Sequence, residues 1–437
     1  MDFLLFLLLN FTLFVRPADF MPGYEDLSLY NYVLLATLAV AWPKIANYLF
    51  SGQAFRDPIT ACVVGLIPAI ALSNLSHFDL WGARMNAWEF TKVVIYYLTL
   101  VSVVNSTERL RSFLYSIALF AAATSAIAVL DHFDVIDIPT LHAVQEGVFD
   151  PVTGETTTIP RLRATGIFAD PNDLSMLCVF SMVICTMGLT DQSQGMFRFA
   201  WLAPFGLLCL TLVLTKSRGG ILSLIAAAGV LSYYRFGLWK TAALALVCAP
   251  ALLLAGGRQV DLGNGMSGGT GQARIELWYC GLVAMRQSPL FGIGYGNYTE
   301  ECVQVAHNSF VHSFVELGLF GGALFLGAFW LSALSLWKLG HGSNASLQIF
   351  TTGSFQRLQP FVLAGVLGFA VSQFSISRTY VIPTYFIFGS ANVYALEAQR
   401  QGLPPAIDLN GRRLGELLLA GIAFLILIYL FIRLTIH

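Results

Sequence analysis

One arginine stands at a place in the chain where a charge is costly. Arg218 lies in the sequence TKSRGG, between two apolar runs that are long enough to cross a membrane and leave almost no loop. A charge at mid-bilayer costs about 2.5 to 3.5 kcal/mol on insertion scales, so it needs a partner or a cavity. Gly219 and Gly220 at a helix start would add exposed N–H groups and a positive dipole end. We therefore expect an anion site, against the alternative of a turn whose Lys216 and Arg218 lie at the lipid headgroups.

A second arginine begins a segment of helical character. In RIELWYCGLVAMRQ, Arg274 and Trp278 are one helical turn apart and the remainder is apolar, which predicts an interfacial helix over 274–287. The glycines of SPLFGIGYGNY then end this helix. Two arginines from separate segments can grip a diphosphate bidentately, which lysine does less well. The alternative for Arg274 is a solvated charge on the helix surface.

A histidine opens the next apolar run, in AHNSFVHSFVELG. A neutral imidazole can accept a proton near physiological pH, and we interpret His307 as a general base with Asn308 and Glu316 as neighbouring substrate contacts. A lone structural histidine is the alternative. His312 follows five residues later, off the same helical face, and is interpreted as structural. A zinc site using these histidines and Cys302 lacks recognised ligand spacing, so no metal is expected.

The sequence RLRATGIFADPNDLSM marks a loop that closes into a span. Asp170 or Asn172 can cap a helix that begins around Pro171. Arg161 and Arg163 precede this cap and can meet an anionic head group. Arg163, Asp170 and Asn172 are therefore further candidate substrate contacts, with capping alone as the alternative for the last two.

The elements that carry these residues are membrane helices. Of 437 residues, 56% are apolar and 11% are charged, against about 25% charged in a soluble domain. We predict an all-α polytopic membrane protein that forms a single membrane domain, 1–437, of twelve or thirteen transmembrane helices, the first being either interfacial or an uncleaved span. The candidate spans are 2–16, 29–50, 58–77, 88–106, 110–131, 172–190, 198–215, 219–235, 238–256, 309–337, 358–376, 380–397 and 415–434. A net charge of −1 and the lack of a basic run argue against nucleic acid as a partner.

Two long connections separate these spans, 132–171 and 257–308. The Lys and Arg residues of the short loops place the N-terminus inside, so both connections are expected on the periplasmic side. Both mix charges, aromatics and turn residues with apolar stretches, which is typical of ordered, functional loops. Cys280 and Cys302 lie in the second connection. They can pair in an oxidising compartment, but the sequence leaves their separation open.

The chain contains, in this order, the sequences TGIFADPNDLS, TKSRGG, ARIELW, SPLFGIGYGN and HNSFVHSFVELGLFGG. By these sequences and their order it resembles the O-antigen ligase and O-antigen polymerase (WaaL/Wzy-type) superfamily of bacterial membrane proteins. The motifs cover residues 160–325, and the remainder is similar in hydropathy only. The resemblance implies a membrane fold related to C-type glycosyltransferases, in the bacterial inner membrane, with its active site facing the periplasm. It also implies an undecaprenyl-diphosphate-linked glycan as donor.

The same resemblance implies a division of roles. Arg218 and Arg274 would hold the diphosphate, and His307 would act on the acceptor hydroxyl. Arginines that counter the leaving group's charge can replace a metal, and no cofactor is needed. Direct displacement would invert the anomeric carbon. The acceptor is either another lipid-linked glycan, as in a polymerase, or lipid A–core, as in a ligase, with a slight preference for the polymerase and its chain-length regulator.

Two other classes of function stay open at this point. A transporter or flippase of lipid-linked sugars, or of another anion, would line its path with Arg218. Such transporters commonly have paired interrupted helices in two halves, and the sequence has no such symmetry. A non-catalytic scaffold of an export complex is the third possibility.

Overall fold

The chain is nearly all helical. A computed structural model describes residues 1–19, 29–138, 141, 143–149, 156–255, 270–341, 353–408 and 410–435. In chain order the elements are α1 (Asp2–Phe14), η1 (Pro17–Asp19), α2 (Leu29–Phe50), α3 (Gln53–Arg56), α4 (Pro58–Leu75), α5 (Leu80–Val103), α6 (Thr107–His132), β1 (Val144–Phe149), β2 (Thr156–Arg161), η3 (Gly166–Phe168), α7 (Pro171–Thr190), η4 (Gln192–Trp201), α8 (Leu202–Thr215), α9 (Arg218–Phe236), α10 (Leu238–Ala255), α11 (Thr270–Met285), α12 (Tyr298–Cys302), α13 (Ser309–His341), α14 (Ser354–Ser372), α15 (Ile382–Arg400) and α16 (Gly411–Thr435).

Every span expected from the sequence coincides with a helix. Among the described residues, eight helices are long and apolar enough to cross a membrane: α2, α4, α6, α7, η4 with α8, α9, α13 and α16. The helices α1, α5, α14 and α15 occupy four other expected spans without meeting both requirements, and α10 occupies the expected span 238–256. α1 has only 13 residues, and α5 carries Arg84, Glu89 and Lys92. The chain is thus a polytopic membrane protein, as expected, with eight clear spans among the residues that the structure describes.

The two long connections each contain an ordered element. In the first, β1 and β2 form an antiparallel hairpin in which Val144 pairs with Arg161. No strand was expected there, although the β-branched run in TTTIPR favours one. In the second, the expected interfacial helix is α11, which begins four residues earlier than predicted, at Thr270.

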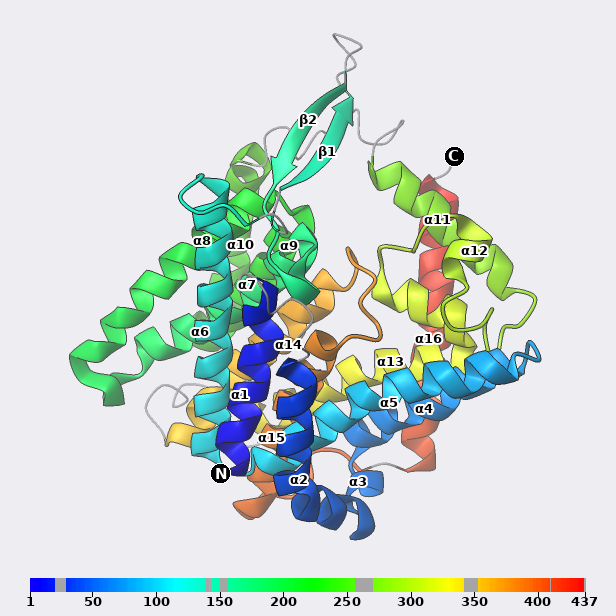
Figure 1. Cartoon of the computed structure of the whole chain (residues 1–437), viewed down its shortest axis with the longest axis horizontal. Helices are drawn as coiled ribbons and strands as arrows, with labels where there is room; N and C mark the ends of the chain where they lie inside the picture. Colours follow the sequence, from blue (N-terminus) through cyan, green and yellow to red (C-terminus); the bar gives the residue numbers. More distant parts are fainter. Residues whose placement is uncertain are drawn as a thin grey trace. The chain divides into compact units, whose positions relative to one another are not determined.

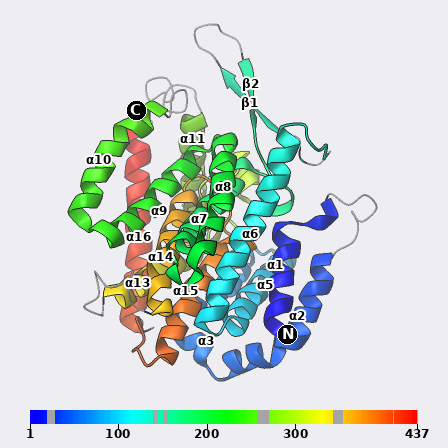
Figure 2. The ribbon, with the colours of Figure 1, turned by 90° about the vertical axis from the view of Figure 1, so that its left-hand side faces the viewer.

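The described residues divide into two compact units. Unit 1 comprises Met1–Lys44, Ser102–Leu231 and Thr351–Ser372. Its centre is α7, which packs against α6, α8 and α14 (Figure 2). Asp191, which follows α7, pairs with Arg111 at 3.9 Å and Arg357 at 3.6 Å. Burial opposes its charge, but hydrogen bonds from Ser193 and Gln194 and the Arg357 charge hold the pKa of Asp191 below its ordinary value.

Unit 2 comprises Ile45–Val101, Ser232–Phe350 and Gln373–His437. Its centre is α13, which packs against α4, α15, α16 and α11 (Figure 1). The side of α16 away from these contacts leaves Leu419 67% and Leu427 66% exposed. Side chains of that kind suit acyl chains, so α16 has the composition of a lipid-facing helix.

Candidate functional site

The turn that holds Arg218 lies in unit 1 and is as tight as its sequence predicts. α8 ends at Thr215, and Lys216 takes the left-handed conformation with φ 51°. Ser217 then caps α9, because its Oγ accepts a hydrogen bond from the Gly220 N–H at 3.1 Å. Arg218 is the first residue of α9, and it is exposed. Its side chain makes no hydrogen bond or ion pair to any part of the chain that the structure describes.

Asn172 joins this turn to the start of α7. Its Oδ1 accepts from Ser217 Oγ at 2.8 Å and from the guanidinium of Arg161 at 3.1 Å. Arg161 also donates through Nε to the carbonyl of Thr215 at 2.9 Å. Asp170 caps α7 as predicted, accepting from the Asn172 N–H at 2.7 Å, with Pro171 in the first turn. The N-terminal ends of α7 and α9 therefore meet, which concentrates positive dipole ends beside arginine side chains.

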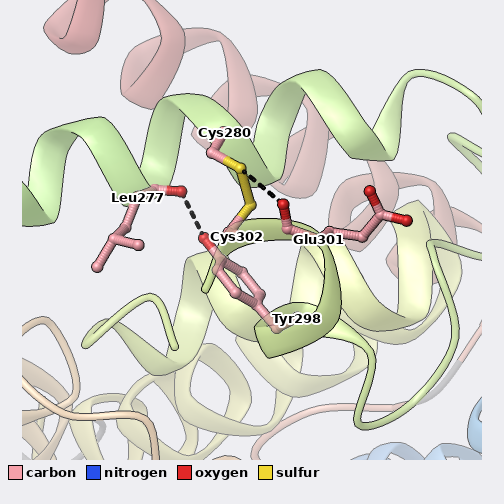
Figure 3. Close-up of a disulfide and its surroundings, with 5 residues drawn as sticks. All are labelled: Leu277, Cys280, Tyr298, Glu301 and Cys302. Atoms are coloured by element: carbon pink, nitrogen blue, oxygen red, sulfur yellow. Dashed lines mark hydrogen bonds between the residues drawn. A yellow bond between two sulfur atoms is a disulfide. The ribbon is translucent and has the colours of Figure 1, made fainter. Parts of the chain in front are cut away.

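Arg274 lies on α11, in unit 2, and this helix is tied to the segment that follows it. Cys280 forms a disulfide with Cys302, whose Cα lies 5.9 Å away (Figure 3). The Tyr298 hydroxyl donates to the Leu277 carbonyl at 2.8 Å, and Sγ of Cys280 lies 3.5 Å from the carbonyl oxygen of Glu301. The pairing that the sequence left open is thus present in the structure.

A hydrogen bond also connects α11 to the residue that precedes the candidate base. Trp278, one turn after Arg274, donates through its indole N–H to the carbonyl of Ala306 at 2.7 Å. Ala306 immediately precedes His307. Arg274 and His307 therefore lie on segments that are in direct contact, which the sequence could not show.

His307 itself sits in a strained backbone conformation. Its φ is 48°, and that of Val303 is 67°, both in the left-handed region. For Val303, which is β-branched, this conformation is a genuine outlier. Each residue in such a conformation costs on the order of 1–3 kcal/mol, so the surrounding structure must enforce it. The disulfide at Cys302 and the bond to Ala306 hold one side of this segment. Asn308 holds the other as N-cap of α13, where its Oδ1 accepts from the N–H groups of Phe310 and Val311.

The glycine-rich sequence after α11 supplies backbone hydrogen bonds to carbonyl groups at a break in α13. The helix is interrupted at Gly318, with φ 65° and ψ −167°. The freed carbonyls of Val315 and Glu316 accept from the N–H groups of Ile293 at 3.0 Å and Gly294 at 3.2 Å. Gly292 and Gly318 lie where any Cβ would overlap the backbone of the other segment. SPLFGIGYGN therefore positions the first half of α13, residues 309–317, and its role is structural.

Glu316 and His312 form a pair that the sequence interpretation missed. His312 Nε2 lies 3.0 Å from Glu316 Oε1, and both side chains are buried. The spacing of five between His307 and His312 predicts that the two histidines lie on different faces of the helix. His312 is, however, four residues from both Asn308 and Glu316, and this spacing predicts that the three side chains share one face.

The structure thus groups the expected site residues in two sets. Arg163, Asp170, Asn172 and Arg218 belong to unit 1, and Arg274, His307, Asn308 and Glu316 belong to unit 2. No cluster of three or more His, Cys, Asp or Glu side chains with the geometry of a metal site occurs among the described residues.

Residues 203–326 match a family model described as O-antigen ligase (Wzy_C). No curated protein matches the chain. The matched segment runs from α8 to the middle of α13 and includes both candidate arginines and the candidate base. Residues 203–326 of the chain are therefore similar to the O-antigen ligase family, whose members are membrane glycosyltransferases of polysaccharide assembly.

Proposed function

We propose that this O-antigen ligase-type protein transfers or polymerises an undecaprenyl-diphosphate-linked oligosaccharide at the periplasmic face of the bacterial inner membrane. The products would be O-antigen, lipopolysaccharide or exopolysaccharide. The observation that carries the proposal is that Arg218, Arg274 and His307 all fall within the matched segment. The hydrogen bond from Trp278 to Ala306 adds support, because it holds an arginine-bearing helix against the residue before the histidine.

The proposed reaction is a direct displacement at the anomeric carbon of the donor. His307 accepts the proton of an acceptor hydroxyl, whose oxygen forms the new glycosidic bond. The bond from the anomeric carbon to the diphosphate oxygen breaks, and undecaprenyl diphosphate leaves with the electron pair. Arg218 and Arg274 stabilise the charge that develops on the diphosphate. Attack opposite the leaving group inverts the anomeric configuration, and no metal takes part.

The meeting of two helix N-termini supports the role of Arg218. Backbone N–H groups and dipoles at such ends favour a phosphate. Arg161, which donates to Asn172 and Thr215, brings a further cation to the same turn. Arg163 and Asp170, close by in sequence, are further candidates for donor contacts.

The disulfide supports the proposed orientation. A bond between Cys280 and Cys302 persists in an oxidising compartment and is rare in a reducing cytosol. The disulfide thus supports a periplasmic location for the connection that carries α11 and α12, as does the distribution of Lys and Arg in the short loops.

Purified protein, given a lipid-linked oligosaccharide with acceptor and no added metal, tests the proposal directly. Transfer should fall by a factor of about 10² to 10⁴ in His307→Ala and in Arg274→Ala. Arg286→Ala, just beyond the end of α11, and His132→Ala, at the end of α6, are matched controls that should retain activity. Full activity in either site variant would remove the assigned role.

A polymerase is slightly preferred to a ligase, and the acceptor decides between them. Elongation of a lipid-linked repeat by the purified protein supports a polymerase, whereas transfer to lipid A–core supports a ligase. Lipid scrambling in vesicles that survives His307→Ala, with no transfer by the unaltered protein, would instead support the transporter or flippase.

A further inference from the structure

The first half of α13, together with its N-cap Asn308, carries a buried polar face. Asn308, His312 and Glu316 recur every four residues and so lie on one side of the helix. Their exposed fractions are 0%, 8% and 1%. Three polar side chains buried in a row need a reason, because each costs free energy unless it is hydrogen-bonded.

Hydrogen bonds within the chain use only part of this face. Glu316 Oε1 accepts from His312 Nε2 at 3.0 Å and lies 3.4 Å from the Tyr298 N–H. Nδ1 of His312, Nδ2 of Asn308 and Oε2 of Glu316 are buried and have no hydrogen-bond partner among the residues that the structure describes. One hydrogen-bonding atom therefore remains free on each of three successive turns.

The free atoms of His312 and Asn308 differ in character. A carboxylate only accepts hydrogen bonds, so Nε2 of His312 carries the proton that it donates to Glu316. The other ring nitrogen, Nδ1, accepts in an imidazole and donates in an imidazolium, and a hydroxyl group can serve either form. Nδ2 of Asn308 is a donor, because its Oδ1 already caps α13. Two such atoms one helical turn apart match a pair of hydroxyl groups, each of which both donates and accepts.

Aromatic rings pack around the imidazole of His312. The ring of Tyr298 stacks on the imidazole of His312 at 5.3 Å between centroids, and Tyr380 meets it edge-on at 5.9 Å. Tyr295 packs on Tyr380 at 4.4 Å. Rings beside hydroxyl-matching groups are suited to a sugar, whose faces are apolar and whose rim is polar. The buried carboxylate of Glu316 disfavours a second anion, which argues against the diphosphate as occupant.

We propose that His312 and Asn308, with Glu316 behind them, bind a pair of hydroxyl groups on the acceptor saccharide and so orient its nucleophilic hydroxyl toward His307. The proposal rests on the transferase function proposed above and deepens it by assigning the acceptor subsite. His312 and Asn308 are positioning residues in this scheme. Asn308 is next to His307 in the chain, so a sugar held here presents its neighbouring atoms to the base.

His312→Gln separates a binding role from a structural one. The glutamine amide replaces the Nε2–H donor and keeps the bond to Glu316, but has no atom in the place of Nδ1. We expect the acceptor KM to rise about tenfold, the effect of one lost hydrogen bond, with a smaller change in kcat and in the donor KM. Asn308→Asp is the second variant, because a carboxylate keeps the cap on α13 and removes the Nδ2 donor. It should raise the acceptor KM as well.

Ser313→Ala is the matched control, since Ser313 Oγ donates to the Phe310 carbonyl and residue 313 lies about 100° around the helix from His312. Acceptors lacking single hydroxyls complete the test. The deoxy sugar that loses affinity for the unaltered protein should bind His312→Gln no worse than its parent does. An acceptor KM in His312→Gln equal to that of the unaltered protein would overturn the inference. Absence of any transfer by the unaltered protein would instead overturn the proposed function.

Discussion

The turn that carries Arg218 in unit 1 and the segment that carries His307 in unit 2 are both held in a fixed conformation, but by different kinds of bond. Around Arg218 the restraints are side-chain hydrogen bonds: Ser217 and Asp170 cap two helices, and Asn172 joins them. Around His307, the restraints are covalent or involve the backbone: a disulfide, and two glycines packed against each other's chain. Side-chain caps hold an unstrained turn, whereas a segment with left-handed Val303 and His307 needs stronger restraint.

The largest effect is expected at the glycine contact. Gly318→Ala places a methyl group into the backbone of Leu290 and Phe291 at a φ of 65°, so neither segment can yield cheaply. The loss of stability should be about 4 kcal/mol or more, and the protein should fail to accumulate. Gly296→Ala is the matched control, because Gly296 has a φ of 84° but open space around it. It should cost only about 1–2 kcal/mol, measured by thermal unfolding in detergent.

The next effect is expected at the disulfide. Cys280 and Cys302 are 22 residues apart, and closing such a loop stabilises a protein by about 3 kcal/mol in the chain-entropy model. Replacing both cysteines by serine should lower the unfolding temperature and increase protease cleavage between α11 and α13. Cys209→Ser, at a free cysteine in unit 1, should change neither. Equal cleavage in both variants would show that the disulfide is not what orders this segment.

The side-chain junction of unit 1 should respond more mildly. Asn172→Ala removes the shared acceptor of Ser217 and Arg161 and should cost about 1–3 kcal/mol. Ser217→Ala removes one cap and should cost about 1 kcal/mol, which Ser217→Asp should largely restore. If Ser217→Ala lowers the unfolding temperature as much as loss of the disulfide does, the contrast between the two regions is wrong.

The smallest effect is a pH dependence in unit 1. The pKa of Asp191 lies below its ordinary value, so its contribution to stability is present above the unfolded-state pKa and is lost as pH falls below about 4. Asp191→Asn should remove roughly 1 kcal/mol at neutral pH and flatten this part of the unfolding profile. A profile that keeps its acid slope in Asp191→Asn would assign the slope to another carboxylate.

Local chemistry explains what the sequence predicted well. Asp170 before Pro171, and two glycines after Arg218, are signals confined to one helix end, and both ends formed as expected. Long apolar runs likewise predicted helices, because hydrophobicity sets a span wherever its neighbours lie.

Contacts across long stretches of chain explain what was missed. The break at Gly318 depends on N–H groups supplied by Ile293 and Gly294, more than twenty residues away. The separation of Cys280 and Cys302 depends on the same folding of the loop. The pair of His312 and Glu316 is the exception, because its spacing of four is visible in the sequence, whereas the spacing of five between His307 and His312 predicts different helical faces.

The contact between Gly292 and Gly318 also limits how this protein can vary. A bulky residue in a core can usually be accommodated by a smaller one opposite, so destabilising changes have partners that suppress them. Here both positions already hold the smallest residue, and the atoms opposite each are backbone. Neither glycine can rescue a change in the other. Suppressors of Gly292→Ala, if selected, must act by moving the whole loop, and should map to residues such as Ser73 or His77 that bond to this junction from α4 and its C-terminal end.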